Sequence, residues 1–76
     1  MIKQDVQNLS VAVIALKLGD KELAATYLYT ARTQTRSRHI KDLTYALSDL
    51  HNLAPHIEAL RKERKEWEKR QMETAP

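Results

Sequence analysis

Histidine is the side chain in this sequence with the widest catalytic and metal-binding chemistry, and it occurs three times, as His39, His51 and His56. His51 and His56 are five residues apart, whereas two metal ligands share one helical face at a spacing of three or four. No serine, aspartate or glutamate stands with the histidines in a recognisable nucleophile arrangement. Zero cysteines and a single glycine exclude thiolate zinc sites and glycine-rich phosphate loops. We therefore expect no enzymatic activity, no metal, no cofactor and no small-molecule substrate.

Cations and one tryptophan offer a second kind of chemistry, that of binding a macromolecule. Thirteen Lys and Arg against ten Asp and Glu give a net charge of +3, and several of the bases form a run without an acid before Asp42. Such a run can contact phosphates, and it can equally stabilise the C-terminal end of a helix. A tryptophan in the charged stretch 61–70 suits an anchor for a partner. The candidate partner-binding residues are Arg32, Arg36, Arg38, Lys41 and Trp67.

The elements that carry these residues are predicted to be helices. Glycine and proline are rare, and apolar residues recur every three or four positions, which predicts a helix over 2–18 and a second over 21–35. Gly19 follows the first helix, where a left-handed residue is needed, and Asp20 is placed to cap the second. The two helices should fold back on each other as a tight hairpin.

A third helix is predicted over 38–71, with Ser37 as its N-cap. Pro55 interrupts it, and the helix either kinks there or gives way to a new helix starting at Pro55. We favour the kink, because no glycine or polar loop accompanies the proline. Residues 1–60 then form one helical domain, and residues 61–76 form a charged helical tail that frays at its end.

Assembly into a homodimer is expected from the size of the chain. A 76-residue domain buries only about 60% of its unfolded surface, and without cysteine the remaining support is oligomerisation. Residues 9–18 are apolar on nearly every side, so that helix needs cover from more than one neighbour. The fold class is thus all-α, a helical hairpin plus a long third helix in a homodimeric bundle. Its predicted dimer or core interface comprises Val6, Leu9, Val13, Leu16, Ile40, Leu43, Leu47 and Leu50.

Two family resemblances centre on Gly19. Residues 19–31, GDKELAATYLYTA, resemble the second helix of a tetratricopeptide repeat, which implies close helix packing through small residues. No second copy follows 34 residues later, so we interpret the match as hairpin packing. The spacing from Ala15 to Gly19 is similar to that of helix-turn-helix domains, although Asp20 stands where those motifs are usually apolar. That resemblance implies DNA binding through a helix that begins at Lys21.

The function that we predict is that of a non-enzymatic protein-interaction module, a regulator, inhibitor or adaptor acting on another protein. The alternative is a nucleic-acid-binding regulator that uses a degenerate helix-turn-helix and the basic cluster from Arg32 to Lys41. The absence of cysteine, of a leader pattern and of a long apolar run leads us to expect a cytoplasmic protein without membrane contact. Small chains of this kind often serve as accessory proteins of phages or mobile elements.

Overall fold

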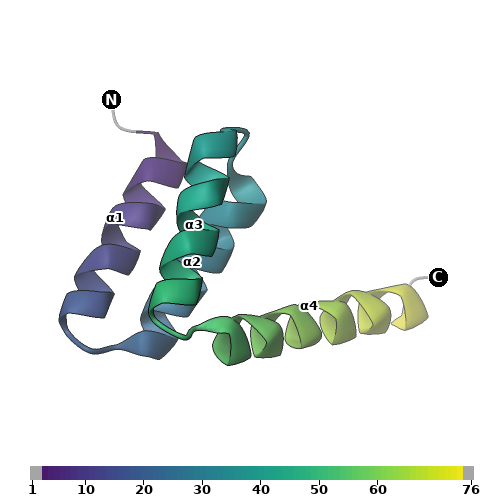
Figure 1. Ribbon diagram of the computed structural model, residues 1–76. Coiled ribbons are helices and arrows are strands. Elements are labelled where there is room, and N and C mark those ends of the chain that lie inside the picture. Colours follow the sequence, from purple (N-terminus) through teal and green to yellow (C-terminus); the bar gives the residue numbers. More distant parts are fainter. Residues whose placement is uncertain (1–2, 75–76) are drawn as a thin grey trace.

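The computed structural model describes residues 3–74, and these residues form helices without any strand, so the all-α prediction is confirmed. Figure 1 shows α1, α2 and α3 running up and down beside one another, while α4 leaves their lower end as a separate arm. None of the helices within residues 3–74 is long and apolar enough to cross a membrane. The helices are α1 (Gln4–Lys17), α2 (Lys21–Gln34), α3 (Arg38–Leu50) and α4 (Ala54–Thr74).

The turn between α1 and α2 has the predicted caps. Gly19 adopts a left-handed φ of 78°, and its N–H donates to the Leu16 carbonyl at 3.1 Å. The N–H of Asp20 donates to the Ala15 carbonyl at 2.9 Å, which completes a Schellman motif. The Asp20 side chain then accepts a hydrogen bond from the Leu23 N–H at 3.0 Å and caps α2. The chain therefore reverses within three residues, and α1 and α2 pack as an antiparallel hairpin.

The expected single third helix over 38–71 is corrected by the structure, which has two helices in this region. Asn52 adopts a left-handed φ of 57°, and the N–H of Leu53 donates to the Ser48 carbonyl at 2.9 Å. This is a second Schellman motif, in which asparagine takes the position more often held by glycine. The chain breaks at Asn52, three residues before Pro55, and a kink at the proline is not needed.

Pro55 is the second residue of α4, where it costs little. The first turn of a helix leaves its N–H groups unpaired, so the missing proton of proline removes no hydrogen bond. Leu53 is fully buried, and its carbonyl accepts from the Ile57 N–H at 3.0 Å, the first helical bond of α4. Because α4 continues unbroken past residue 60, the expected boundary between domain and tail falls inside one helix.

Small residues form most of the core. Ala12 and Ala15 of α1 and Ala24 of α2 are buried with at most 1% of their surface exposed, and a methyl side chain allows two helix backbones to approach closely. Leu28 is the largest buried side chain of the hairpin. Leu53, directly before α4, and Ile57 of α4 add apolar bulk to the core, which fixes the direction in which α4 leaves the body.

Candidate interaction surfaces

The predicted interface residues lie on α1 and α3, two helices that contact each other. Leu9, Leu16 and Leu47 are half-buried and pack against the core. Val6 and Val13 are 37% and 36% exposed, and Leu43 and Leu50 of α3 are more exposed still. We call the eight residues the α1–α3 surface: Val6, Leu9, Val13, Leu16, Ile40, Leu43, Leu47 and Leu50.

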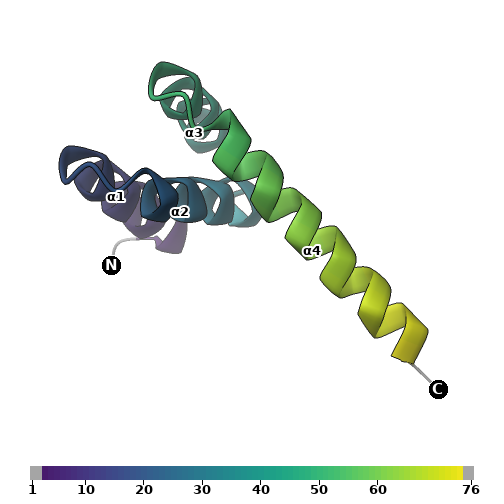
Figure 2. The same cartoon turned by 90° about the horizontal axis from the view of Figure 1, so that it is seen from below.

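The residues of the α1–α3 surface are carried by two helices that contact each other. Figure 2 shows α1 and α2 in one layer with α3 on one side of it. Spacings of three and four place each stripe on one flank of its helix, and α1 and α3 contact each other directly. In the single chain Leu43 is 48% and Leu50 is 74% exposed. Large apolar side chains on both of these contacting helices are thus left partly uncovered.

Of the four candidate cations, Arg32 is engaged within the fold. Its guanidinium carbon lies 3.7 Å from the centroid of the Tyr45 ring, and its Nε donates to the Thr44 hydroxyl at 3.3 Å. Nη2 of Arg32 is buried and has no hydrogen-bond partner within residues 3–74. The stacking joins α2 to α3. Arg32 therefore contributes to the packing of these two helices, and its guanidinium is less available to a partner than the other three cations.

The other three candidate cations stay together at one end of the body. Arg36, Arg38 and Lys41 are exposed, and they line one hollow with Thr35 and Ser37 at the start of α3. The Ser37 hydroxyl accepts from the Ile40 N–H at 3.4 Å, as predicted for its N-cap role. No acid lines that hollow, so the local field is positive.

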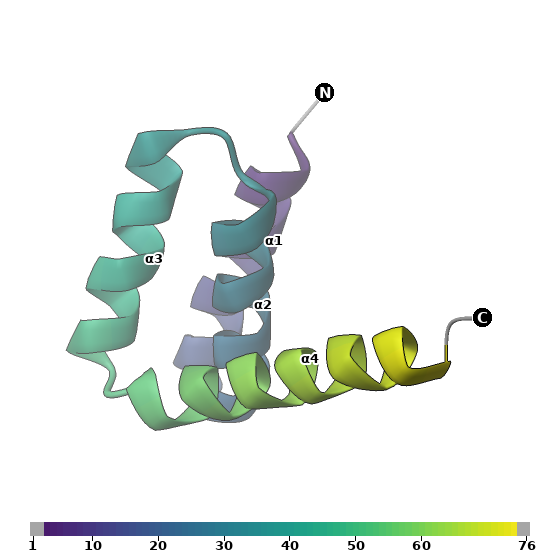
Figure 3. The same ribbon diagram turned by 90° about the vertical axis from the view of Figure 1, so that its right-hand side faces the viewer.

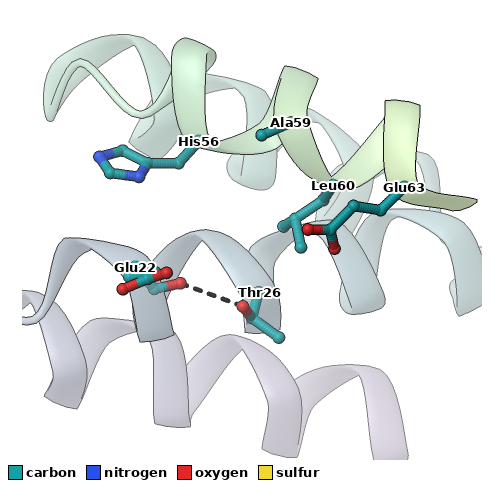
Figure 4. A pocket seen from close by; sticks show the side chains of 6 residues that line it. All are labelled: Glu22, Thr26, His56, Ala59, Leu60 and Glu63. Carbon is teal, nitrogen blue, oxygen red and sulfur yellow. Dashed lines mark hydrogen bonds between the residues drawn. The ribbon is translucent and has the colours of Figure 1, made fainter.

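One of the three histidines, His56, lines a hollow between α2 and α4. Residues 3–74 contain no group of three His, Asp or Glu side chains able to hold a metal ion. Figure 4 shows the hollow of about 140 Å³ between α2 and α4, where His56, Glu22 and Glu63 lie around its rim. Thr26 in the same hollow donates its hydroxyl proton to the Glu22 carbonyl at 3.0 Å, an ordinary intrahelical bond. The hollow is a recess between two packed helices.

Trp67 lies on the part of α4 that extends past the body. Every residue from 61 to 73 is exposed, and Trp67 itself is 60% exposed. Figures 2 and 3 show this segment running away from the other three helices. We call residues 61–74 the α4 arm. Sequence analysis identified the tryptophan and gave a new helix at Pro55 as the less favoured alternative to a kink. It did not identify Asn52, whose left-handed conformation lies between α3 and α4.

Comparison with known proteins gives no match from which a role could be inferred. No family model, curated protein or solved structure matches the chain. The geometry also differs from the helix-turn-helix resemblance, since α1 and α2 lie antiparallel (Figure 1) whereas the helices of that motif cross at about 90–120°. The interaction surfaces are therefore interpreted from their own chemistry.

Proposed function

We propose that this chain is a non-enzymatic protein-interaction module, a regulator, inhibitor or adaptor that binds another protein through the α1–α3 surface. The observation that supports this most is the exposure of Val6, Val13, Leu43 and Leu50 on adjoining helices. Large apolar side chains gathered on one face favour a partner, because covering them removes apolar area from water. The chemistry that fits is an amphipathic helix whose own apolar residues recur at three and four.

A second copy of the chain is the other occupant that the sequence predicts for this surface. The two occupants are separated by the double variant Val13→Glu/Leu43→Glu, which places two carboxylates on the surface. Immobilised wild type should retain a defined protein from host lysate that the double variant fails to retain. Leu23→Glu is the matched control, because Leu23 is 42% exposed on α2, outside this surface.

The oligomeric state of the same variants completes the test. If the surface binds another protein, the double variant keeps the wild-type mass in sedimentation equilibrium. If it instead holds a second copy, a wild-type mass of twice 8.8 kDa falls to that of one chain in the double variant. Retention of the same protein by wild type and double variant would contradict the proposal.

Nucleic-acid binding is the second candidate, favoured by the acid-free hollow that Arg36, Arg38 and Lys41 line. It ranks lower for two reasons. Arg32 is committed to Tyr45 and Thr44, so the cluster has three free cations and not four. The antiparallel hairpin also presents no crossing recognition helix to a major groove.

A further inference from the structure

The side of the α1–α2 hairpin that faces away from α3 carries exposed apolar side chains. Figure 2 shows α1 and α2 in one layer with α3 on one side of it. On α2 the covered side is marked by Arg32, which contacts Thr44 and Tyr45 of α3. Leu23 precedes Arg32 by nine residues, or two and a half helical turns, so it lies on the opposite side of α2. Leu23 is 42% exposed, and Tyr27, one turn later on the same flank, is half-buried.

α1 adds two more apolar side chains to this side. Ile14 and Leu18 are four residues apart on one flank, and they are 57% and 78% exposed. Ile14 directly precedes the buried Ala15 of α1, as Tyr27 directly precedes the buried Leu28 of α2. Antiparallel helices are related by a half-turn about an axis perpendicular to their layer. This rotation leaves each side of the layer in place, so Ile14 and Tyr27 lie on the same side. We call Ile14, Leu18, Leu23 and Tyr27 the hairpin back.

The α4 arm borders the hairpin back. Figures 2 and 3 show the arm passing α2 and extending on the side of the hairpin away from α3. Trp67 follows Leu60 by seven residues, close to two helical turns, so it lies on the flank of α4 that packs against the core at Leu60. Past α2 this flank is open, and Trp67 is 60% exposed. α2 and the arm thus meet at an angle, with Leu23 on one side of it and Trp67 on the other.

A helix that crosses the arm fits this angle, whereas one that runs along the arm does not. The core and α2 already occupy the flank of Trp67 as far as residue 64, which closes it to a helix parallel to α4. A helix parallel to α2 needs only the part of the arm beyond α2. Residues 65–74 extend about 15 Å at 1.5 Å per residue, and two packed helices lie about 8–10 Å apart. One helix therefore has room beside α2 and against Trp67.

The chain itself supplies a helix with a matching flank. Ile14 and Leu18 lie at the C-terminal end of α1 and Leu23 lies at the start of α2, at the end of the body from which α4 leaves (Figure 1). A two-fold axis parallel to the hairpin sets the hairpin back of one copy against that of another and keeps these ends together. α1 of each copy then runs antiparallel to α2 of the other, with Leu18 near the other copy's arm. A two-fold contact requires a surface that is complementary to itself, and the hairpin back with the arm meets this requirement.

The charges at this end favour the same arrangement. Lys17, next to Leu18, is exposed on α1. Glu22 of α2 and Glu63 of the arm lie around the hollow between these two helices in Figure 4. Within residues 3–74 neither carboxylate takes part in a salt bridge. In the two-fold pair Lys17 of one copy lies near the two carboxylates of the other, twice by symmetry, and opposite charges across an interface help to fix its register.

We propose that the chain forms a two-fold homodimer in which α1 of each copy packs between α2 and the α4 arm of the other. A second copy supplies the further cover that a chain of 76 residues needs, because α3 covers only one side of the hairpin. This inference goes beyond the proposed function and does not depend on it. Since the hairpin back faces away from α3, the α1–α3 surface stays free for a different protein.

The test is sedimentation equilibrium of the full chain over a range of concentrations. Wild type should approach twice 8.8 kDa. Leu18→Glu places a carboxylate in the interface and should give the mass of one chain, with the wild-type helix content by circular dichroism because Leu18 is 78% exposed in that chain. Trp67→Ala should raise the dimer dissociation constant about tenfold or more. Leu50→Glu is the matched control, since Leu50 is 74% exposed on α3, and it should leave the dimer intact.

Fluorescence gives a second readout, because Trp67 is the only tryptophan of the chain. As concentration rises through the dissociation constant, the second copy covers Trp67, and the emission of wild type should shift to shorter wavelength. Leu50→Glu should show the same shift. Leu18→Glu changes α1 and not the arm, yet it should keep the emission of an exposed tryptophan at every concentration.

The same variants separate this dimer from the proposed function. Val13→Glu/Leu43→Glu should keep the dimer, whatever it does to a partner protein. Leu18→Glu should lose the dimer and still retain the protein that binds the α1–α3 surface. A monomeric wild type, a dimer that survives Leu18→Glu, or a dimer that Leu50→Glu weakens as much as Leu18→Glu would each overturn the proposal.

Discussion

The Thr35 hydroxyl lies 2.5 Å from a carboxylate oxygen of Asp5 and donates a hydrogen bond to it, across 30 positions of sequence. The Val6 N–H donates to the other oxygen at 2.8 Å. Both bonds favour the charged carboxylate, and the bond from Thr35 is the larger cause of an Asp5 pKa below its usual 3.8. The Thr35 oxygen also accepts from the Ser37 N–H at 3.0 Å. One hydroxyl thus joins the start of α1 to the α2–α3 loop.

This pair predicts how stability changes in acid. Because the pKa of Asp5 is lower in the folded chain than in the unfolded one, its contribution is complete above the unfolded pKa and is lost as pH falls through the folded pKa. Asp5→Asn should therefore lower the melting temperature at pH 7 and match wild type near pH 2. Asp42→Asn removes an exposed carboxylate without this bond and should show no such convergence. Melting curves by circular dichroism check it, and a difference that persists at pH 2 would contradict it.

The alanine core predicts that a change of side-chain volume destabilises the fold inside the hairpin and is tolerated on its surface. Ala24→Leu forces extra methylenes between α1 and α2 and should destabilise the fold by about 1–3 kcal/mol. Leu28→Ala should cost about 2–5 kcal/mol, because it removes the largest buried side chain of the hairpin. Ala46→Leu makes the same change as Ala24→Leu at an exposed position of α3 and should be near neutral. Urea denaturation measures all three, and equal costs at positions 24 and 46 would be inconsistent with close packing of the hairpin.

Local signals in the sequence were sufficient for the hairpin and its caps, but not for the core or the helix break. Gly19, Asp20 and Ser37 each act within three residues, and each was placed correctly. Val13 and Leu50 were predicted to be interface residues because of their size and spacing, yet the body is built on alanines. Which flank of an amphipathic helix is covered depends on the path of the whole chain, and spacing along one helix does not contain that information.

Asn52 accounts for the break between α3 and α4, which the sequence analysis placed at Pro55 and ranked below a kink. It yields a prediction of its own. Asn52→Val should cost about 1–2 kcal/mol, because a branched side chain resists the left-handed conformation. Asn52→Gly should stay within about 0.5 kcal/mol of wild type. At Gly19 an added methyl meets nothing within 4 Å, so Gly19→Ala should show the backbone cost alone, about 1 kcal/mol. Urea denaturation compares the three, and a valine at position 52 that leaves stability unchanged would argue for a continuous helix.

Removing the arm tests how much it contributes to the stability of the fold. A chain ending at Lys65 keeps Ile57, Leu60 and the contact of Arg64 with Tyr29, so its melting temperature at low micromolar concentration should fall by only a few degrees. A large loss of stability at every concentration would show instead that the arm packs on its own body.

The basic hollow predicts a limited response to nucleic acid. If Arg36, Arg38 and Lys41 each neutralise one phosphate of a duplex, the log–log dependence of affinity on salt has a slope of about −2.7, and affinity falls roughly fortyfold between 50 and 200 mM salt. We therefore expect weak, sequence-independent binding at physiological salt, measured by fluorescence titration with a mixed-sequence duplex and a single strand. The triple alanine variant of these residues should remove it. An equal loss of charge at Lys62, Lys65 and Lys69 should have a smaller effect, because the acids of the arm lie between those lysines. Submicromolar, sequence-selective binding that the first triple variant abolishes would instead make nucleic acid the partner of this protein.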